Sequence, residues 1–455
     1  MREVSSDAGK LDIVMIDEST RIMKFEIDML IASILPIVDE KTRVVLIGDP
    51  CQTKITLRTL PCTASLLTDD PLNISALEWI LWLAIYEDAD PNVFVDCADL
   101  LNRYKDSLRC REEACRAVNS LTELCLPGKP DLWNTMVRGK KVWADLTPQP
   151  SSSLARLDAF RRATTPEVVA IKRMRGEKER LPSDFSTVGY RGKSRHDHDV
   201  ALYSALTAVF MRVCERRQRR ALKEKHQHFD ITEETARTWS DAPVDVTIIA
   251  AYASMVDLLR LAVEFVQWLL RWAPRRSRED AGEGSLTVTS VSLDSVQGET
   301  FDHAVLALPP QTSQWSPYLC DPCRQMVLLS RHKVQVAISP VVDDGLSPQT
   351  NSFGTSVRAF LELQARAREK WSWEKMTKTL GLDSAYDDMS WAQWLYWATW
   401  WNSTWSSSDC SSWEAQAAVT WNAETASTRE IPVFPSPIAY RGRKLVSLRL
   451  SLIHI

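Results

Sequence analysis

The sequence predicts an α/β fold with parallel strands, and two features near its start indicate this. Residues 11–20 form an apolar, β-branched run, and residues 21–38 follow it with the apolar spacing of a helix. Residues 42–49 again have the composition of a buried strand. A continuous apolar strand followed by a helix is typical of a parallel sheet that is covered on both faces. We therefore expect a doubly wound α/β architecture.

The composition is that of a globular protein and by itself indicates no particular function. A chain of 455 residues has room for two or three domains, and its net charge of -4 excludes a basic field over the whole molecule. A nucleic-acid partner would therefore have to bind to local basic segments, such as residues 212–226. Ten cysteines without a signal peptide predict reduced thiols in an intracellular protein. The longest apolar run, residues 79–86, is too short to span a bilayer, so we expect no membrane segment.

Polar side chains end both early strands. Asp17 and Glu18 end the first strand, and Gln52 follows the second. Carboxyl ends of parallel strands share the edge of the sheet where ligands bind. At that edge one carboxylate can hold Mg²⁺ through water, a second can polarise an attacking water, and an amide can sense the γ-phosphate of a nucleotide. The competing interpretation is that this segment is a surface turn without a functional role, because Gly, Asp and Pro at residues 48–50 are residue types that favour turns.

The segments MIDEST (15–20) and VVLIGDPCQ (44–52) resemble motifs II and III of superfamily 1 helicases, especially the Upf/Sen-like group that works on RNA and DNA. The resemblance implies two RecA-like domains, the first of them incomplete, with ATP and Mg²⁺ bound in the cleft between them. It assigns Asp17 to the metal and places Gly48 and Asp49 at the nucleotide.

Further segments resemble the remaining motifs in family order. Residues 106–130 resemble the start of the second motor domain, residues 244–255 motif IV, residues 286–308 motif V and residues 324–338 motif VI. Three positions depart from the family pattern, because Leu108, Met255 and Thr300 replace a tyrosine, a glutamine and an acidic residue.

These motifs carry expected roles by resemblance. Arg109 and Arg331 would reach the nucleotide phosphates, with Arg331 as the arginine finger. Gln297 and Gly298 would lie at the nucleotide and link it to the bound strand. Single-stranded RNA or DNA would contact the other two motif residues, Tyr252 and Thr300.

The phosphate-binding sequence G-x-x-x-x-G-K-[ST] is missing from the chain. Residues 187–194 come closest, but Thr187 stands where the first glycine belongs. Because the chain starts only a few residues before motif II, we expect this loop to have preceded Met1 in a longer helicase. The chain as given should then hydrolyse little or no ATP.

The predicted domains are the distal part of the first RecA-like domain (1–95), the second with a basic insertion (96–345), and a tryptophan-rich extension (365–455). The segment from Trp391 to Trp421 contains no Lys or Arg, so we expect the extension to contact protein rather than nucleic acid. The expected function is that of an ATP-dependent nucleic-acid helicase or translocase. The alternative is a non-catalytic nucleic-acid-binding or protein-interaction module derived from one.

Overall fold

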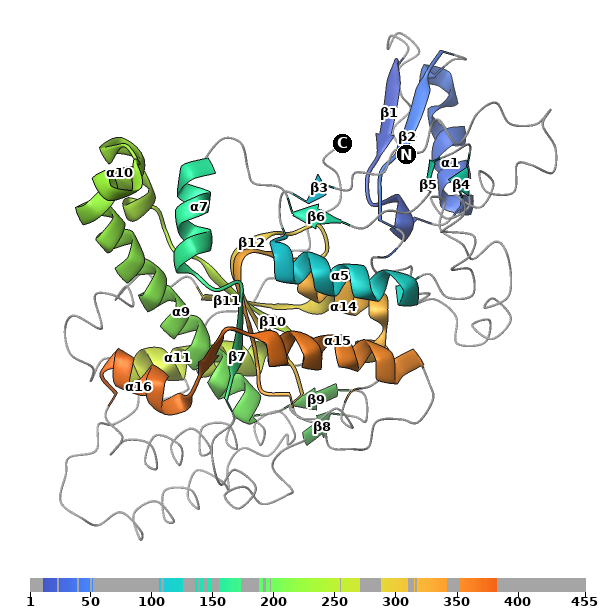
Figure 1. Ribbon diagram of the computed structural model, residues 1–455. Helices are drawn as coiled ribbons and strands as arrows, with labels where there is room; N and C mark the ends of the chain where they lie inside the picture. The colour runs from blue at the N-terminus through green and yellow to red at the C-terminus, as the bar shows by residue number, and fades with distance from the viewer. Residues whose placement is uncertain are drawn as a thin grey trace, which may run out of the picture. The chain divides into compact units, whose positions relative to one another are not determined.

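A computed structural model gives the fold of the chain (Figure 1). It describes residues 11–22, 24–38, 41–49, 51, 106–107, 110–125, 136–137, 140–141, 146–148, 155–172, 188–190, 194–196, 198–253, 255–270, 288–309, 315, 317–341 and 352–382. All of them belong to the first of two compact units, Met1–Ala398, and the second spans Thr399–Ile455. Gln52, Arg109 and the tryptophan-rich segment after residue 382 lie outside the described residues.

Six parallel strands form the main sheet, in the spatial order β11-β10-β12-β13-β7-β14 (Figure 1). The strands are β7 (Val168–Ile171), β10 (Val246–Ala250), β11 (Val288–Ser292), β12 (Phe301–Ala307), β13 (His332–Ile338) and β14 (Glu369–Trp371). Four of these, β10 to β13, lie within the segments 244–255, 286–308 and 324–338 that resemble motifs, and the parallel α/β class is confirmed. The strand β7 was not predicted, and its run of four apolar residues is buried between β13 and β14.

Helices cover both faces of this sheet, as a buried parallel sheet requires. The long helix α9 (His198–Lys225) and α11 (Met255–Leu270) pack together on one face. The opposite face carries α5 (Glu112–Cys125), α14 (Pro322–Leu329) and α15 (Ser352–Arg366), which bury their apolar residues against alternate residues of the strands. The helix α9 begins at His198, just after residues 194–196, which form the short strand β9.

The connections from β10 and β12 run in opposite directions along the sheet. The chain leaves β10 through α11 toward β11 at one edge, and it leaves β12 through α13 (Pro317–Cys320) and α14 toward β13 on the other side. Since β10 and β12 are neighbours, their carboxyl ends form the topological switch point of the sheet.

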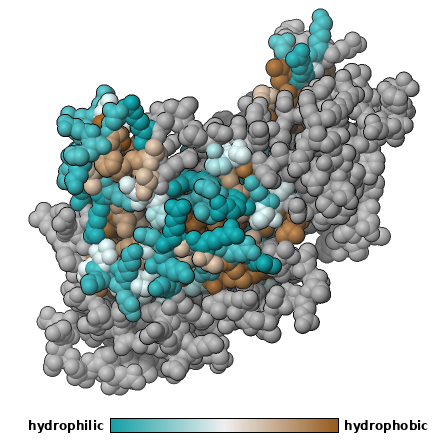
Figure 2. All heavy atoms as spheres, viewed as in Figure 1, coloured by the Kyte–Doolittle hydropathy of each residue, from teal (hydrophilic) through white to brown (hydrophobic). Residues whose placement is uncertain are grey.

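The N-terminal segment forms a separate two-stranded parallel sheet of β1 (Ile13–Ile16) and β2 (Arg43–Leu46), connected through α1 (Lys24–Ile34), as the sequence predicts. The side of the sheet that carries Ile16 and Leu46 packs on apolar residues that include Leu30 of α1. On the other side, Met15 is 66% exposed. Figure 2 shows hydrophobic residues at the surface of the described part among the hydrophilic ones.

The segment after α15 completes the main unit. Residues 365–382 were predicted to belong to the tryptophan-rich extension, but β14 pairs with β7 and α16 (Trp373–Leu380) packs on α9. The Trp371 ring lies 4.7 Å from that of Phe210, and the Trp373 ring 5.1 Å from that of Tyr203. These two tryptophans are therefore core residues of the main unit.

The remaining described elements are short. They are the 3₁₀ helices η1 (Ser19–Arg21), η2 (Leu35–Ile37), η5 (His226–Phe229) and η6 (Leu293–Ser295), the helices α7 (Ala155–Thr164) and α10 (Glu233–Asp241), and the strands β3 (Asp106–Ser107), β4 (Met136–Val137), β5 (Lys140–Lys141), β6 (Thr147–Pro148), β8 (Val188–Tyr190) and β9 (Ser194–His196). Within the described ranges, no helix has the length and apolar character needed to cross a membrane.

Candidate functional site

The carboxyl ends of β1 and β2 are tied together just where the sequence places its first candidate residues. Ile47 N–H donates to the Ile16 carbonyl at 2.8 Å, and the Ser19 amide and hydroxyl both donate to the Ile47 carbonyl, at 2.9 and 2.8 Å. This arrangement fixes the backbone on both sides of Asp17 and Glu18. Asp17 is exposed, Glu18 is half-buried, and the Glu18 amide donates to Asp17 Oδ1 at 2.8 Å.

Glu18 has an unusual backbone and a distant partner. Its φ of 51° lies in the left-handed region, which few residues other than glycine adopt. Its side chain accepts a hydrogen bond from Gln297, whose Nε2 lies 2.8 Å from Glu18 Oε2 across 279 residues of sequence. Gly298 has a φ of 83°, which favours glycine at that position. The predicted residues of motifs II and V therefore meet in the folded chain.

Arg331 lies at the start of β13 and is only 1% exposed. Its guanidinium donates from Nε to the Val327 carbonyl at 3.0 Å, from Nη1 to the Glu299 carbonyl at 3.3 Å and from Nη2 to the Ser330 hydroxyl at 2.9 Å. The Arg331 carbonyl accepts from the Phe301 amide at 2.8 Å. Arg331 is thus hydrogen-bonded to the loop that carries Gln297, and its guanidinium donates to carbonyl groups of the chain.

The other predicted residues have more ordinary positions. Gly48 is exposed, and Asp49 accepts a hydrogen bond from the Cys51 amide at 2.9 Å, as aspartate does in turns. Tyr252 follows β10 and Thr300 precedes β12, and both are half-buried. The described residues contain no group of three or more possible metal ligands.

A tyrosine and an arginine that the sequence analysis did not single out lie close to Tyr252. The Tyr318 and Tyr252 ring centres are 6.0 Å apart, and the Arg324 guanidinium lies 4.0 Å from the Tyr318 ring centre. Burial raises the pKa of Tyr318, and its hydrogen bond to the Asp294 carboxylate adds to this. Arg324 pairs with Asp321 at 2.8 Å and with Asp294 at 4.0 Å.

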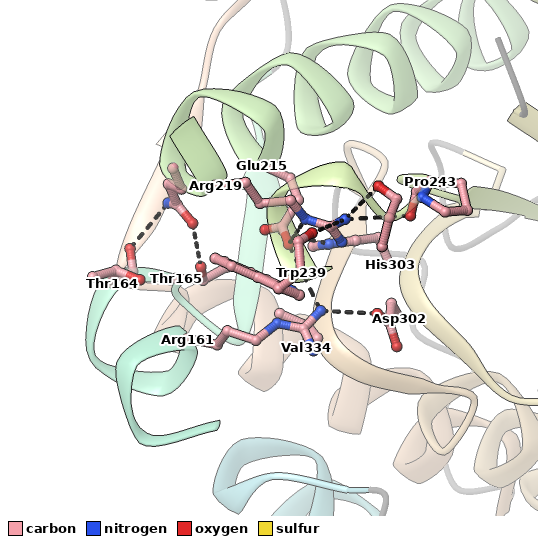
Figure 3. Close-up of polar contacts among 12 residues, drawn as sticks. Arg161, Thr164, Thr165, Glu215, Arg219, Trp239, Pro243, Asp302, His303 and Val334 are labelled. Atoms are coloured by element: carbon pink, nitrogen blue, oxygen red, sulfur yellow. Dashed lines mark hydrogen bonds and ion pairs between the residues drawn. The ribbon is translucent and has the colours of Figure 1, made fainter. Parts of the chain in front are cut away.

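A charge network links α7 and α9 to the first half of β12 (Figure 3). Glu215 of α9 accepts from Arg219 Nε at 3.0 Å, and its Oε2 lies 3.6 Å from His303 Nε2. Arg161 joins Glu215, at 3.7 Å, to Asp302, at 2.8 Å. Burial pushes the pKa of Glu215 upward, but the neighbouring His303, Arg161 and Arg219 outweigh it and leave this pKa at about 2.

A second pair of the same kind follows Arg331. His332 Nε2 lies 3.5 Å from Glu167 Oε1, and both residues are buried. The Glu167 carboxylate also accepts from the amides of Glu113 and Ala114, at 2.8 and 3.0 Å, at the start of α5. Burial raises the pKa of Glu167, but His332 and the two amides together hold it below its usual value. A histidine within the first three residues of a largely apolar strand was the available sequence signal for both pairs.

Comparison with protein-family models and with curated proteins gave no match to this chain. The assignment of a function therefore rests on the motifs and on the contacts that join them.

Proposed function

We propose that the chain carries the motif II to motif VI part of an ATP-dependent superfamily 1 helicase or translocase. The observation that carries this proposal is the hydrogen bond from Gln297 Nε2 to Glu18 Oε2, at 2.8 Å. The motif resemblance assigns both residues to one nucleotide site, although 279 positions separate them in the sequence. A chance resemblance gives no reason for these two side chains to meet.

The proposal extends to the architecture. The six-stranded parallel sheet with helices on both faces would be the second RecA-like domain. The β1-α1-β2 unit would be part of the first, with Glu18 at its carboxyl edge. In RecA-type motors the nucleotide lies between two such domains, which agrees with a contact from Glu18 to the loop before β12.

Each residue of the cluster then has a chemical task. Asp17 is an exposed single carboxylate, which suits Mg²⁺ because this ion keeps several waters and takes one or two protein carboxylates beside the phosphates. Mg²⁺ would neutralise charge on the phosphate oxygens of ATP. Glu18 would accept a proton from the attacking water, and the Gln297 amide would hold Glu18 in position for this.

Arg331 and its hydrogen bonds supply a route between the nucleotide and the motif V loop. Its Nη1 donates to the Glu299 carbonyl, two residues after Gln297. A phosphate that attracted the guanidinium would compete with this carbonyl, so the loop would respond to the state of the nucleotide. This coupling is what a motor needs to convert hydrolysis into movement along a strand.

Strand binding with and without nucleotide tests the proposal. Fluorescence anisotropy of labelled oligothymidylate and oligouridylate would be measured at low salt, with and without millimolar Mg·ATP. We expect strand binding, and we expect Mg·ATP to change the affinity by about fivefold or more, the lower end of typical coupling. Gln297→Ala should abolish this change, whereas Gln227→Ala, an exposed glutamine in η5, should preserve it.

One observation favours the alternative function, a non-catalytic module. The Arg331 guanidinium is buried and donates to carbonyl groups of the chain, whereas an arginine finger has to present its guanidinium to a phosphate. Strand binding that does not respond to Mg·ATP would support this module over the motor. Absence of strand binding by the folded wild-type chain would overturn both functions.

A further inference from the structure

Three segments that are distant in the sequence meet at the start of α5. Arg111 Nη1 donates to the Thr165 carbonyl, just before β7, at 3.0 Å and to the Val334 carbonyl, on β13, at 2.8 Å. The Cys110 thiol lies 3.9 Å from the Ser330 carbonyl and donates a weak hydrogen bond to it. These contacts join α5 to β13 and to the segment before β7.

Glu167 lies at the centre of this junction. Its Oε2 accepts from the Glu113 amide at 2.8 Å, and its Oε1 accepts from the Ala114 amide at 3.0 Å. The same Oε1 lies 3.5 Å from His332 Nε2. Glu167 and His332 are 7% and 1% exposed, so water has little access to replace these partners.

The arrangement requires a carboxylate. Each oxygen of Glu167 accepts from a backbone amide in the first turn of α5, where the partial positive charge of the helix favours an anion. A glutamine has a single acceptor oxygen and would turn an N–H group toward one of these amides. Only the ionised side chain can hold the helix start and His332 at once.

His332 connects this junction to the proposed nucleotide site. Because it follows Arg331 directly, its contact with Glu167 fixes the backbone from which the Arg331 side chain starts. Arg331 Nη1 donates to the Glu299 carbonyl at 3.3 Å, in the loop that carries Gln297. Within the described ranges, neither ring nitrogen of His332 forms a hydrogen bond with any other group, so the contact with Glu167 orients the imidazole.

We propose that Glu167 is a positioning residue of the nucleotide site and acts through His332 on Arg331. This inference rests on the proposed function and deepens it, because it names the group that lets Arg331 respond to ATP. Glu167 needs no contact with nucleotide or strand. With its carboxylate in place, the start of β13 is held on α5, and a movement of the Arg331 guanidinium passes to the loop that carries Gln297.

Substitutions on both sides of the contact test the role. Strand affinity would be measured by fluorescence anisotropy with and without millimolar Mg·ATP. Glu167→Gln and His332→Leu each break the contact, so the change in affinity on adding Mg·ATP should fall from about fivefold or more to below about twofold. His332→Gln keeps an N–H donor for the Glu167 carboxylate and should keep most of the response. The two His332 variants decide the matter if Glu167→Gln does not fold.

Met376→Ala is the control for a general loss of stability. Met376 lies on α16, is 0% exposed and accepts from the Thr207 hydroxyl of α9 at 3.6 Å, so its replacement leaves a cavity on the face of the sheet opposite α5. Urea unfolding should show that this variant is less stable than the wild type. Its response to Mg·ATP should nevertheless equal that of the wild type.

A response that persists unchanged in Glu167→Gln or in His332→Leu would overturn the positioning role and leave the proposed function intact. A loss that is equally large in His332→Gln or in Met376→Ala would assign the effect to packing or stability and would overturn the role as well. A wild-type chain whose strand affinity does not respond to Mg·ATP would instead refute the motor, and the positioning role with it.

Discussion

Replacing Glu215 by Gln should destabilise the main unit, because it removes a negative charge that three neighbouring groups share, two of them buried. The Glu215 side chain is 1% exposed, and its Oε1 lies 3.0 Å from Arg219 Nε and 3.7 Å from Arg161 Nη2. Its Oε2 lies 3.6 Å from His303 Nε2. Asp302 still pairs with Arg161 in the variant, but Arg219 loses its carboxylate partner inside the protein.

The size of the effect follows from the pKa of Glu215. Folding lowers this pKa from its ordinary value of 4.5 to about 2, which corresponds to about 3 kcal/mol at ~1.4 kcal/mol per unit. Breaking a buried ion pair by removing one partner costs a similar amount, about 3 to 5 kcal/mol. Because the folded-state pKa is the lower one, the contribution is complete above pH 4.5 and disappears as the pH falls through the folded value.

Urea unfolding followed by far-UV circular dichroism, together with hydrogen exchange of α9, measures this contribution. Glu215→Gln should lose about 3 kcal/mol at neutral pH, and its gap to the wild type should narrow below about pH 4.5. Glu224→Gln is the matched control, since Glu224 lies on the same helix and is exposed. Equal stability of the two variants at neutral pH, or a gap that persists unchanged in acid, would refute the reasoning.

Three further outcomes are expected. The purified chain should show little or no ATPase activity, because its sequence has no lysine-bearing phosphate loop, and robust strand-stimulated turnover that Glu18→Gln abolishes would contradict this. Arg331→Ala should lower the free energy of unfolding by roughly 1 to 3 kcal/mol, since it leaves buried carbonyls without their donor, and Arg331→Lys should restore only part of it in urea titrations. Deleting residues 383–455 should change the single-strand affinity by less than about threefold, which is under 1 kcal/mol. Deleting residues 365–455 should also lower the melting temperature, because β14 and α16 are lost. A tenfold loss of affinity in the shorter deletion would show that the extension is a binding surface.

The sequence determined the local elements and the positions of the first candidate residues. The apolar runs at 11–20 and 42–49 contain the parallel strands β1 and β2, because uninterrupted apolar residues are typical of a buried strand. The segment between them has apolar residues at helical spacing and contains the helix α1. Asp17 and Glu18 lie at the carboxyl end of the first strand because the change from apolar to charged residues marks where burial ends. The strand β7 was not predicted, because a run of four apolar residues is too short to show the hydrophobic periodicity of a strand or a helix.

Only the tertiary structure decided which residues meet. The hydrogen bond from Gln297 to Glu18 depends on how two segments 279 positions apart are packed, and a local pattern does not record packing between distant segments. The same holds for His303 beside Glu215, and for Tyr318 beside Tyr252, which become neighbours because the order of strands in the sheet differs from their order in the sequence. Burial of Arg331 has the same origin: Val327 of α14 and Glu299 of the loop before β12 each give a carbonyl to its guanidinium, and only their arrangement in space produces that environment.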